Sequence, residues 1–182
     1  MSTRLRFATV WLGGCAGCHM SLLDMDEWLF ELATHIDLVF SPLADQKTYP
    51  ENVDAVLVEG AIANHDNLEL IRRVRANTKV LISIGDCAIT GNVTALRNPL
   101  GGPEEILRPV YLQSNAINPQ IPDDGGIVPQ LLDKVYPVHM VVPVDVYLPG
   151  CPPPAPRIRA MLEQFLAGGE LKLVGRDMIK FG

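Results

Sequence analysis

The stretch from Arg6 to Cys18, RFATVWLGGCAGC, begins as a buried strand and changes character at two glycines. Its first seven residues are mostly apolar, β-branched or aromatic, which is typical of a strand. Such a run lacks regular polar alternation, as expected for a strand that is covered on both faces of a parallel sheet. Gly13 and Gly14 end the strand, and the pair Cys15 and Cys18 follows at once. This stretch therefore bears on both the fold and the site.

Similar runs and helical patterns alternate along the rest of the chain. Strands are expected at 36–40, 53–59, 79–84 and 144–148, and helices at 18–33, 67–76 and around 158–166. In the first helix the apolar positions recur every three or four residues, which describes one helical face. They are Leu22, Met25, Leu29 and Leu32. Strand alternating with helix predicts an α/β fold, a flavodoxin-like parallel sheet with helices on both faces, in a single domain over residues 1–182.

The segment 92–143 departs from this rhythm and is expected to be a long irregular insertion. It contains eight of the chain's 15 prolines and little periodicity. These prolines are Pro99, Pro103, Pro109, Pro119, Pro122, Pro129, Pro137 and Pro143. Because a structureless stretch of this length is uncommon inside a compact domain, we expect a partner protein to cover it. A surface excursion without a role is the alternative.

Composition excludes several classes of protein. The net charge is −6 and only 6% of residues are aromatic, which argues against a nucleic-acid partner. No stretch approaches the 18 or so apolar residues of a membrane span, and the N-terminal run is a poor signal peptide. We therefore expect a cytoplasmic protein without a membrane partner. In that reducing compartment, four cysteines favour metal or redox chemistry over disulfides.

All four cysteines follow the carboxyl ends of predicted strands. Cys15 and Cys18 follow the first strand, Cys87 follows the strand at 79–84, and Cys151 follows the strand at 144–148. Open parallel sheets build their sites at this edge, where residues that are distant in sequence converge. Glycines precede each group, and they allow the backbone to approach a bulky object closely. The pattern predicts one metal centre with four thiolate ligands.

The spacing favours an iron–sulfur cluster over its alternatives. Structural zinc prefers compact local knuckles, whereas Cys87 and Cys151 lie far along the chain from the first pair. A 4Fe–4S cluster takes four cysteines and tolerates ligands from dispersed loops. A thioredoxin-like dithiol at Cys15 and Cys18 leaves the other two cysteines without a role. Buried structural cysteines are a further alternative, in which the shared edge is a coincidence.

Two other side chains near this edge are candidates for function. His19 follows Cys18 directly and is a candidate for a partner surface. Glu59 ends the strand at 53–59 on the same edge, and it is a candidate proton-relay carboxylate or a loop hydrogen-bond partner. We also expect the N–H groups at the beginning of the helix at Cys18 to act on the cluster, because helix N-termini favour negative charge.

Four motifs, in order, resemble the small subunit of NiFe hydrogenases of the soluble, bidirectional, NAD-reducing type. The first is Gly14-Cys15-Ala16-Gly17-Cys18-His19-Met20-Ser21-Leu22-Leu23-Asp24. The others are Val58-Glu59-Gly60-Ala61-Ile62, Gly85-Asp86-Cys87-Ala88 and Pro149-Gly150-Cys151-Pro152-Pro153. The cluster-bearing small subunit of NADH–quinone oxidoreductase is the second family considered. It carries adjacent cysteines in its first motif, whereas Cys15 and Cys18 are separated by two residues.

The resemblance implies a hydrogenase subunit that transfers electrons and is inactive alone. Cys15, Cys18, Cys87 and Cys151 would bind one 4Fe–4S cluster next to a NiFe centre on a separate large subunit. Electrons would pass on to diaphorase subunits that carry FMN and further clusters and reduce NAD. Residues 92–143 and 15–21 would contact the large subunit. Whether this chain itself binds a flavin stays open.

The chain departs from membrane-bound and periplasmic hydrogenases directly after Cys18. Those enzymes carry a small hydroxyl residue and then Glu at this point, whereas this chain has His19 and Met20. A proton path through that Glu therefore cannot be transferred here. A twin-arginine leader and a C-terminal domain with further clusters are likewise not expected.

Overall fold

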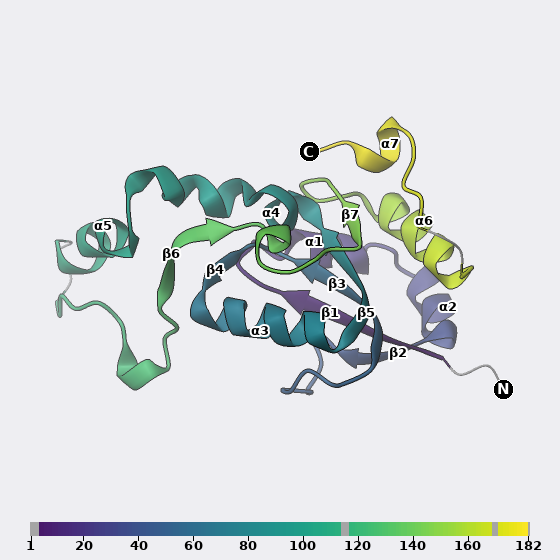
Figure 1. Cartoon of the computed structure of the whole chain (residues 1–182), viewed down its shortest axis with the longest axis horizontal. Coiled ribbons are helices and arrows are strands. Elements are labelled where there is room, and N and C mark those ends of the chain that lie inside the picture. Colours follow the sequence, from purple (N-terminus) through teal and green to yellow (C-terminus); the bar gives the residue numbers. More distant parts are fainter. Residues whose placement is uncertain (1–3, 114–116, 169–170, 182) are drawn as a thin grey trace.

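The computed structural model describes residues 4–113, 117–168 and 171–181, and a five-stranded parallel sheet forms its centre (Figure 1). The strands are β1 (Leu5–Trp11), β2 (Ile36–Phe40), β3 (Val53–Glu59), β5 (Thr78–Ile84) and β7 (Val146–Leu148). Their order is β2-β1-β3-β5-β7, and each neighbouring pair is parallel. This is the flavodoxin-like order, so the predicted fold class is confirmed.

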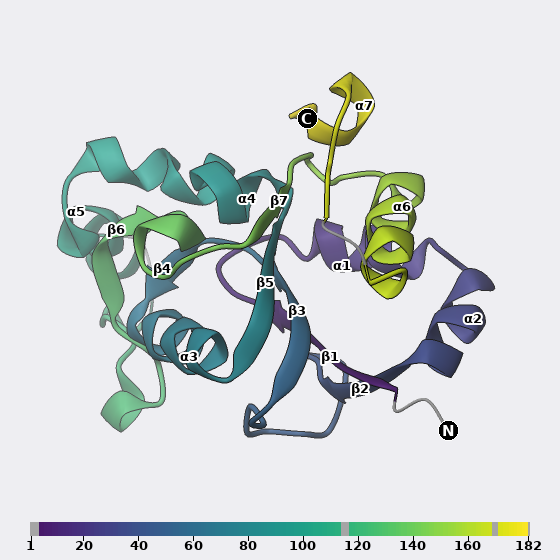
Figure 2. The ribbon, with the colours of Figure 1, turned by 45° about the vertical axis from the view of Figure 1, so that its right-hand side comes forward.

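Helices cover both faces of the sheet (Figure 2). On one face lie α1 (Gly17–Leu23), α2 (Trp28–His35) and α6 (Ala155–Leu166), which pack against strand residues such as Phe7 and Leu57. On the other face lie α3 (His65–Ala76) and α4 (Gly85–Thr90), which pack against Ala8 and Val56. Successive strand residues thus enter opposite cores, because side chains alternate between the faces of a strand. This double burial explains why the strands are continuous apolar runs.

The carboxyl ends of four strands lie level with one another. Trp11 of β1 is opposite Glu59 of β3, Glu59 is opposite Ile84 of β5, and Ile84 is opposite Leu148 of β7. Each of these residues is at the end of its strand. The loops that follow therefore leave the sheet at one level and along one edge.

The helix predicted over 18–33 is two helices, so that prediction is wrong about continuity. The chain turns between α1 and α2, where Asp26 adopts a φ of 49°. In this turn the N–H groups of Met25 and Asp26 bond three residues back, to Leu22 and Leu23. The predicted apolar face nevertheless packs in one core, because Leu22, Met25, Leu29 and Leu32 all belong to the same cluster.

The insertion 92–143 is more ordered than predicted. It contains a 3₁₀ helix η1 (Asn92–Leu100), α5 (Pro103–Leu107), a π-helical turn η2 (Arg108–Leu112) and a strand β6 (Leu131–Tyr136). It also contains short 3₁₀ turns η3 (Asp124–Gly126) and η4 (Val138–Met140), while residues 114–116 lie outside the described part. Strand β6 pairs antiparallel with β4 (Ile62–Asn64).

Two side chains of η1 join it to β6 within this insertion, and one of them also contacts β4. The Arg97 guanidinium donates to the carbonyls of Leu132 at 2.7 Å and Ala63 at 3.1 Å. The Asn98 amide accepts from the Val135 N–H at 2.8 Å and donates to the Val135 carbonyl at 2.9 Å. These bonds satisfy backbone groups that the single pairing with β4 leaves open. The part of the insertion that forms η1 and β6 is therefore not irregular, and the expectation that a partner protein covers the segment stays a prediction.

After η4 the chain enters β7 and then α6, and a short helix α7 (Arg176–Ile179) follows near the C-terminus. Within the described residues, no helix combines the length and apolarity needed to cross a membrane.

Candidate metal centre

The four cysteines lie on the loops and helix ends that follow the level carboxyl ends of the strands. Cys15 is in the loop after β1, and Cys18 is in the first turn of α1. Cys87 is in α4, which begins directly after β5, and Cys151 follows β7. Cys18 and Cys87 are buried, whereas Cys15 and Cys151 are exposed. The group thus has a core side and an open side.

The turn between the first two cysteines is strained. Ala16 adopts φ 65° and ψ 7°, the left-handed conformation, which costs about 1–2 kcal/mol for a residue with a Cβ. Such strain persists only where the surrounding structure determines it, and it concentrates at functional sites. The conformation directs the chain from the Cys15 loop into α1.

Gly85 leaves the space that Cys18 occupies. A Cβ on Gly85 would lie 2.2 Å from the Cys18 Sγ, and Gly85 has a φ of 81°. Gly17 is similarly close to the first cysteine, since a Cβ there would lie 3.2 Å from the Cys15 Sγ. Gly85 and Gly17 therefore permit the close approach of two cysteine side chains, and the predicted approach of the backbone to a bulky bound group stays a prediction.

Asp86 connects the loop of Cys87 to the loop of Cys151. Its carboxylate Oδ1 accepts from the Gly150 N–H at 2.7 Å, and its own N–H donates to the Gly150 carbonyl at 2.9 Å. On the opposite side, the Ser21 hydroxyl of α1 donates to the Pro153 carbonyl at 2.6 Å. The Cys151 loop is thus joined to the helices of Cys87 and Cys18. No role was predicted for Asp86 from the sequence, although it directly precedes Cys87 in one of the four motifs.

Glu59 connects the end of β3 to the beginning of α1. Its carboxylate accepts from the N–H groups of Cys18 at 3.4 Å and His19 at 2.9 Å, and it is only 2% exposed. The Glu59 carbonyl also accepts from the Leu12 N–H at 2.8 Å. The expected loop hydrogen bond of Glu59 is confirmed. The N–H groups of Cys18 and His19 thus have Glu59 as their partner, and the predicted action of this helix end on the cluster stays a prediction.

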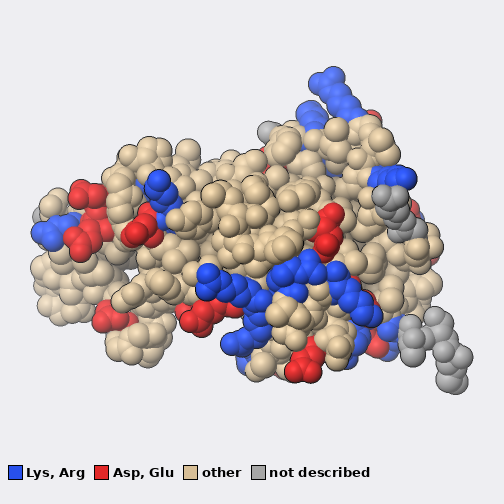
Figure 3. Space-filling view, viewed as in Figure 1, with Lys and Arg blue, Asp and Glu red and all other residues tan. Residues whose placement is uncertain are grey.

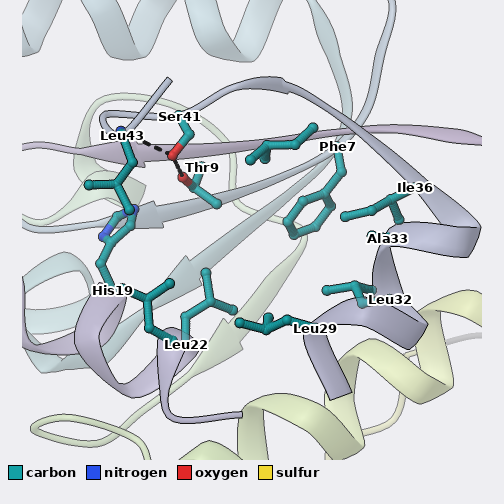
Figure 4. A pocket seen from close by; sticks show the side chains of 12 residues that line it. Phe7, Thr9, His19, Leu22, Leu29, Leu32, Ala33, Ile36, Ser41 and Leu43 are labelled. Carbon is teal, nitrogen blue, oxygen red and sulfur yellow. Dashed lines mark hydrogen bonds between the residues drawn. The ribbon is translucent and has the colours of Figure 1, made fainter. Parts of the chain in front are cut away.

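His19 is buried rather than exposed to a partner, so its predicted place at a partner surface is wrong. Its Nδ1 contacts the Glu59 carboxylate, while its Nε2 has no hydrogen-bond partner among the described residues. The ring lines an apolar cavity of about 270 Å³ between α1, α2 and the first two strands, where Thr9 and Ser41 hydrogen-bond to each other at 3.0 Å (Figure 4). A proton-relay role for His19 and Glu59 stays a hypothesis.

The four thiols lie close enough to affect one another. Burial raises the pKa of the Cys18 thiol well above its usual range, and negative charge on Glu59, Cys87, Cys15 and Cys151 raises it further. Burial also raises the pKa of the Cys87 thiol, although a hydrogen bond from the Thr94 side chain opposes the rise. These two buried thiols are therefore protonated at neutral pH when free, and a cation bound among the cysteines would have to displace their protons.

Cysteine thiolates are ligands both for zinc and for iron–sulfur clusters. Zinc bound to four thiolates requires the sulfurs to lie within about 4 Å of one another, given Zn–S bonds of about 2.3 Å. Yet no three His, Cys, Asp or Glu side chains in the described part of the chain are arranged to hold a single ion. The four thiols influence one another's pKa and lie beside glycines without a Cβ, and four cysteine thiolates are the ligand set of an iron–sulfur cluster.

Comparison with known proteins identifies the class. A family model described as "NADH ubiquinone oxidoreductase, 20 Kd subunit" matches residues 15–165. The chain therefore belongs to this family, whose match extends from the first cysteine past the fourth.

Within this family the relatives are hydrogenase subunits. The chain is 37% identical over 172 residues to the NAD-reducing hydrogenase HoxS subunit delta of Cupriavidus necator, covering 91% of this chain and 80% of that protein. A crystal structure of NAD⁺-reducing [NiFe]-hydrogenase in the H₂-reduced state matches 99% of this chain and 100% of its own, with 38% identity and a TM-score of 0.93. The resemblance expected from the four motifs is confirmed.

Other relatives are longer than this chain. It is 35% identical over 185 residues to a subunit of the F420-non-reducing hydrogenase of Methanothermobacter marburgensis, covering 98% of this chain. The match spans 58% of that protein, and 57% of the corresponding protein of Methanothermobacter thermautotrophicus.

The close approach of Gly85 to Cys18 predicts a specific effect of a methyl group. We expect Gly85→Ala to lower the free energy of unfolding by about 1–2 kcal/mol for the left-handed conformation. Contact with Cys18 should add about 1–3 kcal/mol from overpacking. Gly168→Ala is the matched control, because Gly168 has a φ of 72° and nothing within 4 Å of its Cβ position. Equal urea unfolding midpoints for the two variants would contradict the proposed packing.

Proposed function

We propose that this chain is the electron-transfer subunit of a NiFe hydrogenase and that Cys15, Cys18, Cys87 and Cys151 ligate one 4Fe–4S cluster. One observation carries the proposal: all four cysteines follow strands whose carboxyl ends are level along one edge of the sheet. The confirmed relationship to hydrogenase subunits supports it independently. When bound, the cluster supplies reversible one-electron transfer.

The chain's own residues would hold and shield this group. Cys18 and Cys87 provide ligands from the buried side, where α1 and α4 exclude water. Cys15 and Cys151 provide ligands from the exposed side, which is the side from which another redox centre can approach. Glu59 and Asp86 fix the loops that carry these ligands. These hydrogen bonds would hold the ligand geometry constant between redox states, which would limit reorganisation during electron transfer.

The open side fits a large partner subunit. Exposed apolar side chains occur on the elements around it, including Met20 of α1 and Val93 and Leu96 of η1. Figure 3 shows Lys and Arg gathered over α3, whereas few charged side chains appear over α4 and β7. Depletion of charge around exposed apolar groups is typical of the centre of an interface. We propose that the large subunit with the NiFe centre covers this side.

The proposal extends to the whole complex. Electrons released from hydrogen at the large subunit would pass through this chain to flavin- and cluster-bearing diaphorase subunits that reduce NAD. The similarity to the NAD-reducing hydrogenase HoxS subunit delta supports this assignment over one to the F420-non-reducing hydrogenases. The match covers 80% of HoxS subunit delta but only 58% of the Methanothermobacter marburgensis subunit. Four unpaired cysteines favour the cytoplasm as the compartment.

Replacement of one ligand tests the proposed cluster. We expect Cys151→Ser to abolish or convert the cluster, because an alkoxide is a poorer ligand for iron than a thiolate. Hydrogen-dependent NAD reduction by the assembled complex should fall to background. Val174→Ser, a change at an exposed position in the C-terminal segment, should leave both unchanged. An unaltered cluster spectrum with full iron content in the Cys151→Ser complex would refute the ligand assignment.

Hydrogen exchange tests the proposed interface. Because Arg97 and Asn98 fasten β6 internally, we expect amides of β6 to be protected equally in the free chain and in the complex. Amides in residues 15–21 and in η1 should become better protected when the large subunit binds. Equal protection of these two segments in both samples would show that the large subunit binds elsewhere.

A further inference from the structure

The turn that follows α4 places one side chain against a cysteine of the site. Gly91 ends α4, where its N–H donates to the Cys87 carbonyl at 2.9 Å. It has a φ of 86°, and a Cβ there would lie 2.7 Å from the Ala95 Cβ, so glycine is required. Asn92 follows with a φ of 34°, and its N–H donates to the Thr90 hydroxyl at 3.3 Å. The backbone of Asn92 is thus fixed by its immediate neighbours.

The side chain of Asn92 reaches across to the Cys151 loop. Its amide nitrogen Nδ2 lies 3.3 Å from the Cys151 Sγ, although the two residues are 59 positions apart. A metal-bound thiolate carries no proton and only accepts hydrogen bonds. The donor end of the amide, rather than its oxygen, therefore suits the Cys151 sulfur in the loaded protein.

We propose that Asn92 is a positioning residue that raises the reduction potential of the cluster by donating a hydrogen bond to the Cys151 sulfur. The inference rests on the proposed ligation by Cys151. Reduction adds negative charge to the cluster and its sulfur ligands, so a hydrogen bond to a sulfur stabilises the reduced state more than the oxidised state. The effect acts through Cys151, and Asn92 itself contacts no iron.

A second residue of η1 contacts another loop of the site. The Thr94 hydroxyl donates to the carbonyl of Gly13 at 3.3 Å, in the loop that leads from β1 to Cys15. The first turn of η1 therefore contacts the loops of Cys151 and Cys15 through two side chains. The insertion, which the sequence predicted to be irregular, thus begins with two residues, Asn92 and Thr94, that contact the segments of the proposed cluster site.

A purely structural role for Asn92 makes a different prediction from a role in tuning. Asparagine tolerates the left-handed conformation better than most residues, so Asn92 could be present only for its backbone. Asn52 provides a matched comparison, because it also adopts a left-handed conformation, with a φ of 57°, and is exposed. Glycine accepts both conformations and removes both side chains.

The test is a redox titration of the cluster in the full complex, followed by electron paramagnetic resonance. In Asn92→Gly we expect the ratio of reduced to oxidised cluster at a fixed potential to fall by up to about tenfold. For one electron this is a shift of about 59 mV to lower potential. Asn52→Gly should titrate like the wild type. If Asn92→Gly loads too little cluster, Asn92→Asp keeps the side-chain shape without a donor and should also titrate at lower potential.

The possible results separate the inference from the proposed function. An unshifted potential in Asn92→Gly, or in Asn92→Asp where that variant replaces it, would overturn the role of Asn92 and leave the cluster assignment intact. Loss of the cluster in both Asn92 variants, with normal loading of Asn52→Gly, would show that Asn92 is needed for insertion of the cluster. This result would also overturn the tuning role. Absence of any redox-active signal from this chain in the wild-type complex would instead refute the proposed function.

Discussion

The level carboxyl ends of four parallel strands are the constraint on which the remaining structure depends. Hydrogen bonding between β1, β3, β5 and β7 brings Trp11, Glu59, Ile84 and Leu148 to one height, so the next residue of each strand enters the same edge. Three of these four strands lead to cysteines, and the fourth ends in Glu59. Backbone pairing therefore fixes where the segments that carry the proposed ligands begin.

Two carboxylates convert this edge into a fixed site. Glu59 accepts N–H groups at the beginning of α1, and Asp86 exchanges hydrogen bonds with Gly150. Each carboxylate satisfies backbone donors that would otherwise be buried without a partner, which costs about 1–3 kcal/mol per group. Glu59 also joins the end of β3 to the segment of Cys18, and Asp86 joins the segments of Cys87 and Cys151. Near the proposed cluster, acidic side chains thus have a structural role that is independent of proton transfer.

The sequence predicted most of the sheet and the cysteine edge, because both depend on local patterns. The strands at 36–40 and 53–59 have the bounds of β2 and β3, since strands buried on both faces are uninterrupted apolar runs. The break between α1 and α2 was missed because Met25 continues the apolar face across the turn at Asp26. The pairing of β6 with the three-residue β4 has no local signal. Nor has the contact of Asn92 with Cys151, which only the fold brings together.

The central claim is that one iron–sulfur cluster, rather than a single metal ion, occupies the space among Cys15, Cys18, Cys87 and Cys151. The most direct test is analysis of metal and acid-labile sulfide in the chain, purified without oxygen and separated from its partner subunits. The account predicts about four iron and about four sulfide per chain, with no stoichiometric zinc. One zinc per chain without labile sulfide would contradict it and would make the four cysteines a structural zinc site.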